Sequence, residues 1–312
     1  QGNGQHSYTP NGFPTQSANF GNTTYNWSSM PNSLSYGSSS TQIQAVATLM
    51  YHCGVSVDMQ YAANGSGAFT ENVPAAIANY FRYTDHTTLY DRDSFTRIDW
   101  EEMLIAGLEE GFPFYYAGSE GDAGHAFVCC GVRYSDRKFY FNFGWGADSY
   151  LNGWYAIDAL NTSYMGTFND NQRAIADFIP DYVYNALMPA AKDLTVSCAN
   201  AHSKTGVVSW INPTQNLAGE VIENIDKVVL LRNGVEIFSQ LNVTPGAEMT
   251  FQDEVPEYDC YTYTVYYLTD GIKGRFAKTT YLYGPSCTWK IIGQTSNFQG
   301  WNSGKIQVLS PN

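Results

Sequence analysis

The chain has 312 residues, of which 44% are hydrophobic and only 14% are charged, and its formal net charge is −13. This length exceeds one typical domain and allows a sizeable core, whereas no apolar run approaches the roughly 18 residues that a membrane-spanning helix requires. The acidic balance disfavours nucleic acid as a partner, because phosphates require cationic side chains. The six cysteines include no Cys-x-x-Cys pair, which argues against a zinc ribbon or a redox motif.

Three helices are predicted in the first half of the chain, after a loop-rich stretch over residues 1–38. Apolar residues recur at helical spacing in the segments Gln42–His52, Asn72–Tyr80 and Trp100–Glu110. Ser39 or Ser40 is the candidate N-cap of the first helix. Asp99 is the candidate N-cap of the third helix, which we expect to end at Gly111.

From Pro113 onward the pattern changes to short strands. The predicted strands are Phe114–Ala117, His125–Val132, Lys138–Phe143, Gly153–Ile157 and Ala174–Ile179. A helical half followed by an antiparallel sheet is an α+β layout. We expect residues 1–188 to form one domain of this class, with a cleft between its helical subdomain and its sheet.

A second domain is predicted after Pro189, over residues 189–288. Its strands are Leu194–Cys198, Gly206–Ile211, Lys227–Arg232, Val235–Gln240, Glu248–Gln252, Tyr261–Tyr267 and Lys278–Tyr283. Asn233 and Gly234 predict a two-residue hairpin turn between two of these strands. Seven short strands in succession predict an all-β immunoglobulin-like sandwich, and parts of this segment resemble fibronectin type III domains.

Within the second domain, Trp210 is predicted to be a core residue, because large aromatic side chains dominate such cores. An oxidising compartment would allow one disulfide among Cys198, Cys260 and Cys287, and the sequence leaves all three pairings open. Residues 289–312 are interpreted as the truncated start of a further β domain.

The residues that carry chemistry lie on two successive strands of the first domain. Gly124 and His125 open an apolar strand, and Asn142 and Trp145 follow on the next one. An imidazole held in one orientation can take a proton from a neighbouring thiol. Gly124 allows a substrate to approach closely, Asn142 is expected to hydrogen-bond the far ring nitrogen and fix the tautomer, and Trp145 is expected to shield that bond from water.

These segments, with others in the same order, resemble the catalytic domain of streptopain-like cysteine peptidases, a bacterial family with the papain fold. The shared motifs are Tyr25–Trp27, Ala47–Met50, Val55–Met59, Gly65–Ala68, Asp99–Trp100, Pro113–Tyr116, His125–Val128, Phe141–Gly146, Gly153–Tyr155 and Asp158–Asn161. The resemblance implies a secreted endopeptidase that hydrolyses polypeptide substrates without a cofactor. It also implies His125 as the base, with Ser66, Gly67 and Gly124 in the substrate-binding wall.

Members of this family carry their nucleophilic Cys in a helix-opening segment upstream of the stretch that resembles Gly4–Pro10. The first cysteine of this chain is Cys53, so we expect a family member cut just after its nucleophile segment, with the Cys on an N-terminal segment or propeptide. Cys53 itself is predicted to be a buried core residue. Cys129 and Cys130 lie too far along the strand from His125 for direct proton transfer.

A second hypothesis, of a different class, is an inactive peptidase fold that serves as a binding or adhesion module. The missing nucleophile and the attached β domain support it, whereas the joint presence of His125, Asn142 and Trp145 supports the enzyme. A Cys at the upstream nucleophile position decides for the enzyme, and Ser, Ala or Gly decides for the module. The acidic segments Asp91–Asp93 and Asn169–Asp170 lack the spacing of a calcium loop, so no metal is expected.

Overall fold

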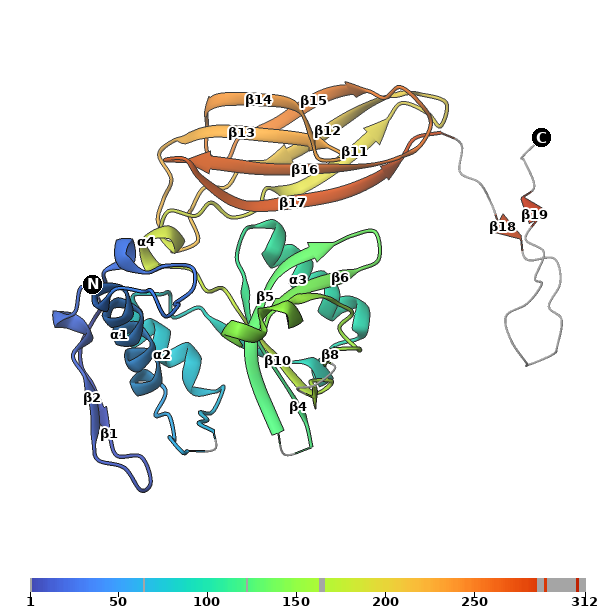
Figure 1. The fold of residues 1–312 in the computed structure, drawn as a ribbon. Coiled ribbons are helices and arrows are strands. Elements are labelled where there is room, and N and C mark those ends of the chain that lie inside the picture. Colours follow the sequence, from blue (N-terminus) through green and yellow to red (C-terminus); the bar gives the residue numbers. More distant parts are fainter. Residues whose placement is uncertain are drawn as a thin grey trace. The chain divides into compact units, whose positions relative to one another are not determined.

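The computed structural model describes residues 2–63, 65–121, 123–162, 166–284, 289–290 and 307–308. The chain divides into two units, Gln1–Tyr184 and Asn185–Asn312. The first unit is a mixed helix and sheet structure, and the second consists of strands (Figure 1). The division falls just before the stretch around Pro189, where the sequence pattern changes.

The helices of the first unit begin at hydroxyl caps where the sequence offers them. They are α1 (Ser40–Ser56), α2 (Asn72–Phe81), α3 (Arg97–Glu109) and α4 (Asp181–Tyr184), with the short 3-10 helices η1 (Phe20–Asn22), η2 (Trp27–Ser29), η3 (Arg92–Ser94) and η4 (Gly146–Leu151). Ser39 caps α1 in a reciprocal box with Gln42. The prediction of Asp99 as the cap of α3 is wrong. The hydroxyl of Thr96 accepts from the Asp99 backbone N–H and donates to its carboxylate, so the helix begins earlier.

Six strands of the first unit form one antiparallel sheet in the order β3-β10-β4-β5-β6-β7 (Figure 1). The strands are β3 (Thr88–Asp91), β4 (Phe114–Glu120), β5 (Ala123–Arg133), β6 (Lys138–Asn142), β7 (Gly153–Tyr155) and β10 (Asp170–Ala176). Two small hairpins stand apart from it, β1 (His6–Tyr8) with β2 (Gln16–Ala18) and β8 (Asn161–Thr162) with β9 (Gly166–Thr167). Within the large sheet, β3 was not predicted as a strand, and β10 begins and ends earlier than the predicted Ala174–Ile179.

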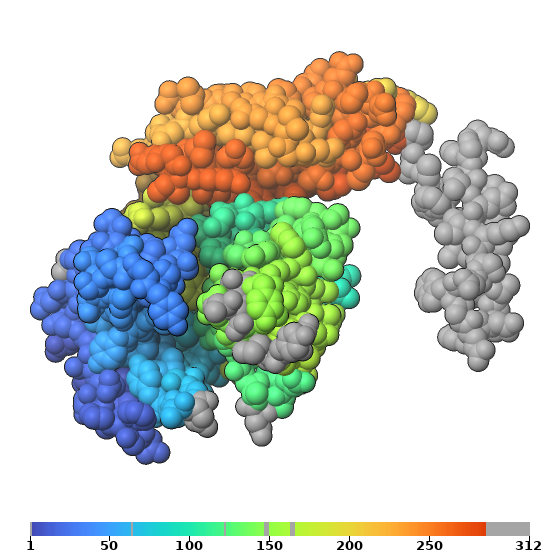
Figure 2. Space-filling model, viewed as in Figure 1, coloured from blue at the N-terminus to red at the C-terminus, as the bar shows by residue number. Residues whose placement is uncertain are grey.

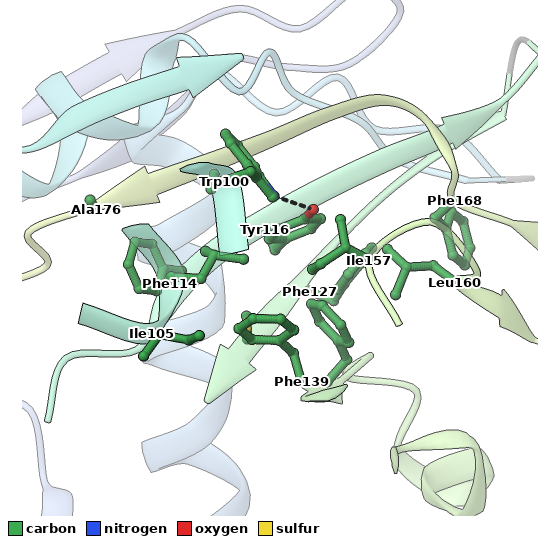
Figure 3. Close-up of a cluster of buried hydrophobic side chains, with 14 of the residues drawn as sticks. Trp100, Ile105, Phe114, Tyr116, Phe127, Phe139, Ile157, Leu160, Phe168 and Ala176 are labelled. Atoms are coloured by element: carbon green, nitrogen blue, oxygen red, sulfur yellow. Dashed lines mark hydrogen bonds between the residues drawn. The ribbon is translucent and has the colours of Figure 1, made fainter. Parts of the chain in front are cut away.

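An aromatic core lies between α3 and one face of this sheet. Trp100 from α3 is fully buried and donates its indole N–H to the hydroxyl of Tyr116 on β4, at 3.0 Å (Figure 3). That hydroxyl donates in turn to Gln172, at 2.9 Å. The buried polar groups are therefore paired, which removes the penalty of burying them. Phe127 of β5 belongs to the same core (Figure 3). Its ring also stacks on that of His125, at 5.8 Å.

Between residues 185 and 284, the second unit has seven strands in two antiparallel sheets, β11-β12-β15 and β14-β13-β16-β17. Their bounds are β11 (Lys192–Cys198), β12 (Thr205–Ile211), β13 (Ile225–Arg232), β14 (Val235–Val243), β15 (Glu248–Glu254), β16 (Cys260–Thr269) and β17 (Ile272–Leu282). Side chains from both sheets, among them Trp210 and Tyr263, share one core. Trp210 is buried as predicted. Asn233 and Gly234 both have positive φ angles, 48° and 81°, as a primed hairpin turn requires.

The predictions of a further β domain and of a disulfide involve residues after 284, few of which the structure describes. Strand β18 (Trp289–Lys290) pairs with β19 (Gln307–Val308), and the rest of the segment interpreted as a further β domain lies outside the described residues. Cys198 and Cys260 are both free, and Cys287 lies outside the described residues. In the part of the chain that the structure describes, no helix is long and apolar enough to cross a bilayer.

Candidate active site

His125 lies near the start of β5, directly opposite Gly118 of β4. Side chains alternate across a strand, so His125 shares the face of Phe127 and Cys129, which belong to the aromatic core. Its half-buried ring packs among four aromatic rings, those of Phe127, Phe143, Trp145 and Phe168, at centroid distances between 4.8 and 6.5 Å. The core therefore holds the imidazole in one orientation.

The hydrogen bond of the imidazole defines its tautomer. Nε2 of His125 lies 2.7 Å from the backbone carbonyl oxygen of Phe143. A carbonyl oxygen can only accept, so Nε2 carries the proton and donates it, and Nδ1 keeps its lone pair. A histidine in this form can act as a base through Nδ1.

This geometry differs from the expectation that Asn142 would bind the ring. The side-chain oxygen of Asn142 accepts from the backbone N–H of Gly144 at 3.0 Å instead. β6 ends at Asn142 and the chain turns at Gly144, whose φ is +75°. Asn142 therefore stabilises the turn that brings the Phe143 carbonyl to His125, and it acts on the ring only through that backbone group.

Trp145 covers one face of the imidazole. Its ring stacks on His125 at 4.8 Å with an interplanar angle of 18°, and it also stacks on Phe143 at 4.9 Å. A stacked indole excludes water from that face, and its π-electrons stabilise a cation above it. Trp145 thus restricts the rotation of the His125 ring.

Two residues that were not predicted, Gly118 and Phe168, help to position the ring of His125. Gly118 must lack a side chain, because an added Cβ would lie 2.4 Å from the Phe168 carbonyl oxygen. The close approach of that segment puts the Phe168 ring 5.6 Å from His125. Neither residue has a sequence signal, since one glycine among 28 and one phenylalanine among 17 do not stand out.

A cavity of about 1740 Å³, here called the groove, opens beside His125. Residues of α1 and α2 line one side, and residues of β4 and β5 line the other. The predicted wall residues Ser66, Gly67 and Gly124 all line it together with His125. Figure 2 shows the surface hollowed between the blue-to-cyan helical part and the green sheet of this unit.

Contacts among residues that line or adjoin the groove join its two sides. Glu71, just before α2, pairs with Arg173 of β10, and Arg173 also binds Asp91 of β3 at 2.8 Å. The hydroxyls of Thr70 and Tyr115 lie 3.3 Å apart. These contacts fix the helical side, and with it Ser66 and Gly67, relative to His125.

The face of α1 that turns to the groove is apolar and open. Leu49 and Met50 line it, and Met50 is 69% exposed. Cys53, predicted to be buried, is exposed and lines the groove. The prediction was wrong because this apolar stripe of α1 faces the groove and not the core. Partial desolvation raises the pKa of the Cys53 thiol, which disfavours the thiolate.

The other candidate cysteines lie as expected. Cys129 is buried in the core and Cys130 is exposed on the opposite face of β5. Burial raises the pKa of the Cys129 thiol well above its usual range. Within the described residues, no group of three or more His, Cys, Asp or Glu side chains gathers as a metal site would require.

Residues 1–155 match the profile of the peptidase C10 family. Among solved structures, the active wild-type interpain A cysteine protease of Prevotella intermedia is 36% identical, with a TM-score of 0.52. The match covers 74% of that structure and 56% of this chain. This chain belongs to the peptidase C10 family. Its first unit therefore has the papain-like fold, as the resemblance to streptopain-like peptidases implies.

Two curated relatives support the assignment. The thiol protease/hemagglutinin PrtT of Porphyromonas gingivalis is 40% identical over 151 residues, and streptopain of Streptococcus pyogenes is 35% identical over 163 residues. These matches cover 48% and 50% of this chain. The chain spans only 17% of the first relative and 40% of the second.

Proposed function

We propose that this chain forms part of a cysteine endopeptidase whose general base is His125. The observation that carries the proposal is the tautomer of His125, which is fixed by the Phe143 carbonyl and leaves Nδ1 as a base beside an open groove. A thiol presented to Nδ1 gives a thiolate and an imidazolium, and Trp145 stacks on the ring that becomes cationic.

The reaction then follows the chemistry of an acyl transfer. The thiolate attacks the scissile carbonyl carbon, and the imidazolium of His125 gives its proton to the leaving amine. His125, again neutral, takes a proton from the water that hydrolyses the thioester. Backbone N–H groups at the start of a nucleophile helix would stabilise the oxyanion. No cofactor takes part in these steps.

The nucleophile is proposed to come from an α-helical segment that opens with a Cys and occupies the groove. A helix is about 10 Å wide and rises about 1.5 Å per residue, so a groove of about 1740 Å³ has room for a short helical segment. The apolar stripe of α1, with Met50 69% exposed, offers such a helix a surface to pack on. Cys53 does not suit the role, because its pKa is raised. An upstream N-terminal segment is the proposed source.

The substrate is proposed to be an extended polypeptide that lies along Ser66 and Gly67. Gly67 exchanges both backbone hydrogen bonds with Gln60, at 2.8 and 3.1 Å. In an antiparallel pair the backbone groups of the neighbouring residues point the other way, so those of Ser66 and Ala68 are left for a substrate strand. Gly124 adds no side chain at the opposite wall, since a Cβ there would meet only one atom, 3.8 Å away.

The location of the protein and the fold of its second unit are also proposed. A chain with only 14% charged residues and 24 tyrosines has the uncharged, polar surface that is common in extracellular bacterial proteins, so we propose that it is secreted. The two sheets of the second unit, β11-β12-β15 and β14-β13-β16-β17, support a fibronectin-III-like sandwich. A separate β module of this kind is the feature that favours the second hypothesis, a binding or adhesion role.

One experiment tests the proposed function. The chain is produced alone, and also together with the segment encoded upstream of it, and thiol-dependent casein hydrolysis is measured for each. We expect no activity from the chain alone, and activity blocked by a thiol-reactive epoxide when the upstream segment is present. His125→Ala should lower that activity by at least about 1000-fold, as in dissected catalytic triads, while Cys53→Ser should leave it unchanged.

Two results would contradict the proposal. Comparable hydrolysis by wild type and His125→Ala would remove His125 from the mechanism. A Ser, Ala or Gly at the nucleophile position of the upstream segment, with no hydrolysis, would leave the binding module as the function.

A further inference from the structure

The β1–β2 hairpin reaches the segment that leads to the substrate-binding wall through three side-chain contacts. Nε2 of His6 lies 2.7 Å from Oδ1 of Asp58. The hydroxyl of Tyr8 donates to the Met59 carbonyl oxygen at 2.6 Å. The backbone N–H of Asn11, between the strands of the hairpin, donates to the side-chain oxygen of Gln60 at 3.0 Å. Three consecutive residues after α1 are thus each held by the hairpin.

Gln60 connects the hairpin to the substrate-binding wall through hydrogen bonds. It exchanges two backbone hydrogen bonds with Gly67, and its side-chain amide donates to the Asp58 carbonyl at 3.1 Å. Among the described residues, a Cβ built on Gly67 would meet no atom within 4 Å, so open space lies beside this residue. The hydrogen bonds of Gln60 therefore contribute to the position of the wall, and the hairpin contributes to the position of Gln60.

The same segment is also held from behind, by α1. Tyr61 lies against the backbone of Gly54, where a Cβ would come within 2.3 Å of the Tyr61 hydroxyl. Asp58 leaves the helix with a φ of +56°, a conformation that non-glycine residues seldom adopt unless neighbouring contacts stabilise it. The hydrogen bond with His6 and the hydrogen bonds of Met59 supply those contacts.

We infer that the β1–β2 hairpin is a positioning element for substrate binding, with Tyr8 and Gln60 as its positioning residues. This inference rests on the proposed function, because it assigns the hairpin to the wall of that same site. Neither residue touches the reacting atoms. Loosening the hairpin lets Ser66 and Gly67 move, which weakens binding of an extended peptide and leaves the chemistry at His125 intact.

Steady-state kinetics on the complete enzyme, with its upstream segment, separate the two effects. Tyr8→Phe keeps the ring and removes only the hydroxyl that binds Met59, and Gln60→Ala removes an exposed side chain without disturbing the core. We expect each to raise KM about fivefold, which corresponds to the loss of one typical hydrogen bond, with kcat within about twofold of wild type. Thr15→Val is the matched control, since the Thr15 hydroxyl bonds only to Thr9 inside the hairpin, at 2.9 Å.

The outcomes are distinct. An increased KM in Tyr8→Phe and Gln60→Ala, with Thr15→Val like wild type, supports the positioning role. An unchanged KM in both variants overturns it, even if their melting temperatures fall, because the hairpin would then be merely structural. If wild type itself shows no activity that depends on His125, the proposed function has failed, and that result is separate from any effect of the hairpin variants.

Discussion

Replacing Asn142 with alanine is expected to slow the proposed peptidase by less than about tenfold. The structure assigns the hydrogen bond of His125 to the backbone carbonyl of Phe143, and a side-chain substitution at residue 142 leaves that carbonyl in place. Asn142→Ala removes one exposed hydrogen bond, from the Gly144 N–H at 3.0 Å. Such a bond contributes about 1 kcal/mol net, and about 1.4 kcal/mol corresponds to a tenfold change in rate.

A direct hydrogen bond from the Asn142 side chain to His125 would predict a much larger loss of activity in Asn142→Ala. If the Asn142 side chain held the ring directly, its loss would release the tautomer, which lowers kcat about 10⁴-fold where it has been measured in a catalytic triad. The assay is kcat/KM on an internally quenched peptide, with His125→Ala as the inactive reference. A loss above about 1000-fold in Asn142→Ala, at an unchanged melting temperature, would refute the assignment of the ring partner to Phe143.

Three further predictions concern stability. Burial lowers the pKa of His52 below about 6.5, so the folded state binds the proton less readily than the unfolded state. The melting temperature should therefore fall as the pH drops from 8 to 5. This fall should be smaller in His52→Gln. Glu101 is 2% exposed and binds two arginines, at 2.8 and 2.6 Å, so Glu101→Gln should lower the free energy of unfolding in urea by about 2 kcal/mol; the exposed Glu102→Gln, its matched control, should change it by less than about 1 kcal/mol. Residues 185–284 expressed alone should unfold cooperatively with a β-type circular dichroism spectrum, and an aggregated product would contradict their independence.

Local patterns were enough to predict much of the fold. The three long helices and most strands of both units follow from apolar spacing, and Asn233-Gly234 indicates its turn because few residue pairs tolerate two positive φ angles. The errors lie where two local signals compete. Thr96 and Asp99 are both good caps, and the hydroxyl of Thr96 prevails because its geometry satisfies the Asp99 N–H and carboxylate together.

The sequence shows which side chains the candidate site contains, but not which backbone groups contact them. His125 was identifiable from its strand, but its partner is a backbone carbonyl, which every residue carries, so nothing in the sequence distinguishes Phe143. The hairpin contact between His6 and Asp58 joins residues 52 positions apart. The exposure of Met50 and Cys53 could not be predicted either, because an apolar helix face indicates burial without saying against which partner.

The geometry of the candidate site depends on contacts from both sides of the groove. The Phe143 carbonyl and the Trp145 stack orient His125, and these belong to the sheet side alone. Glu71 and Arg173 join that side to the helical side, and the β1–β2 hairpin fixes the wall through Gln60. Base and wall are therefore placed by the chain itself. In the proposed function, a thiol presented to Nδ1 of His125 meets a base whose orientation the sheet side already sets.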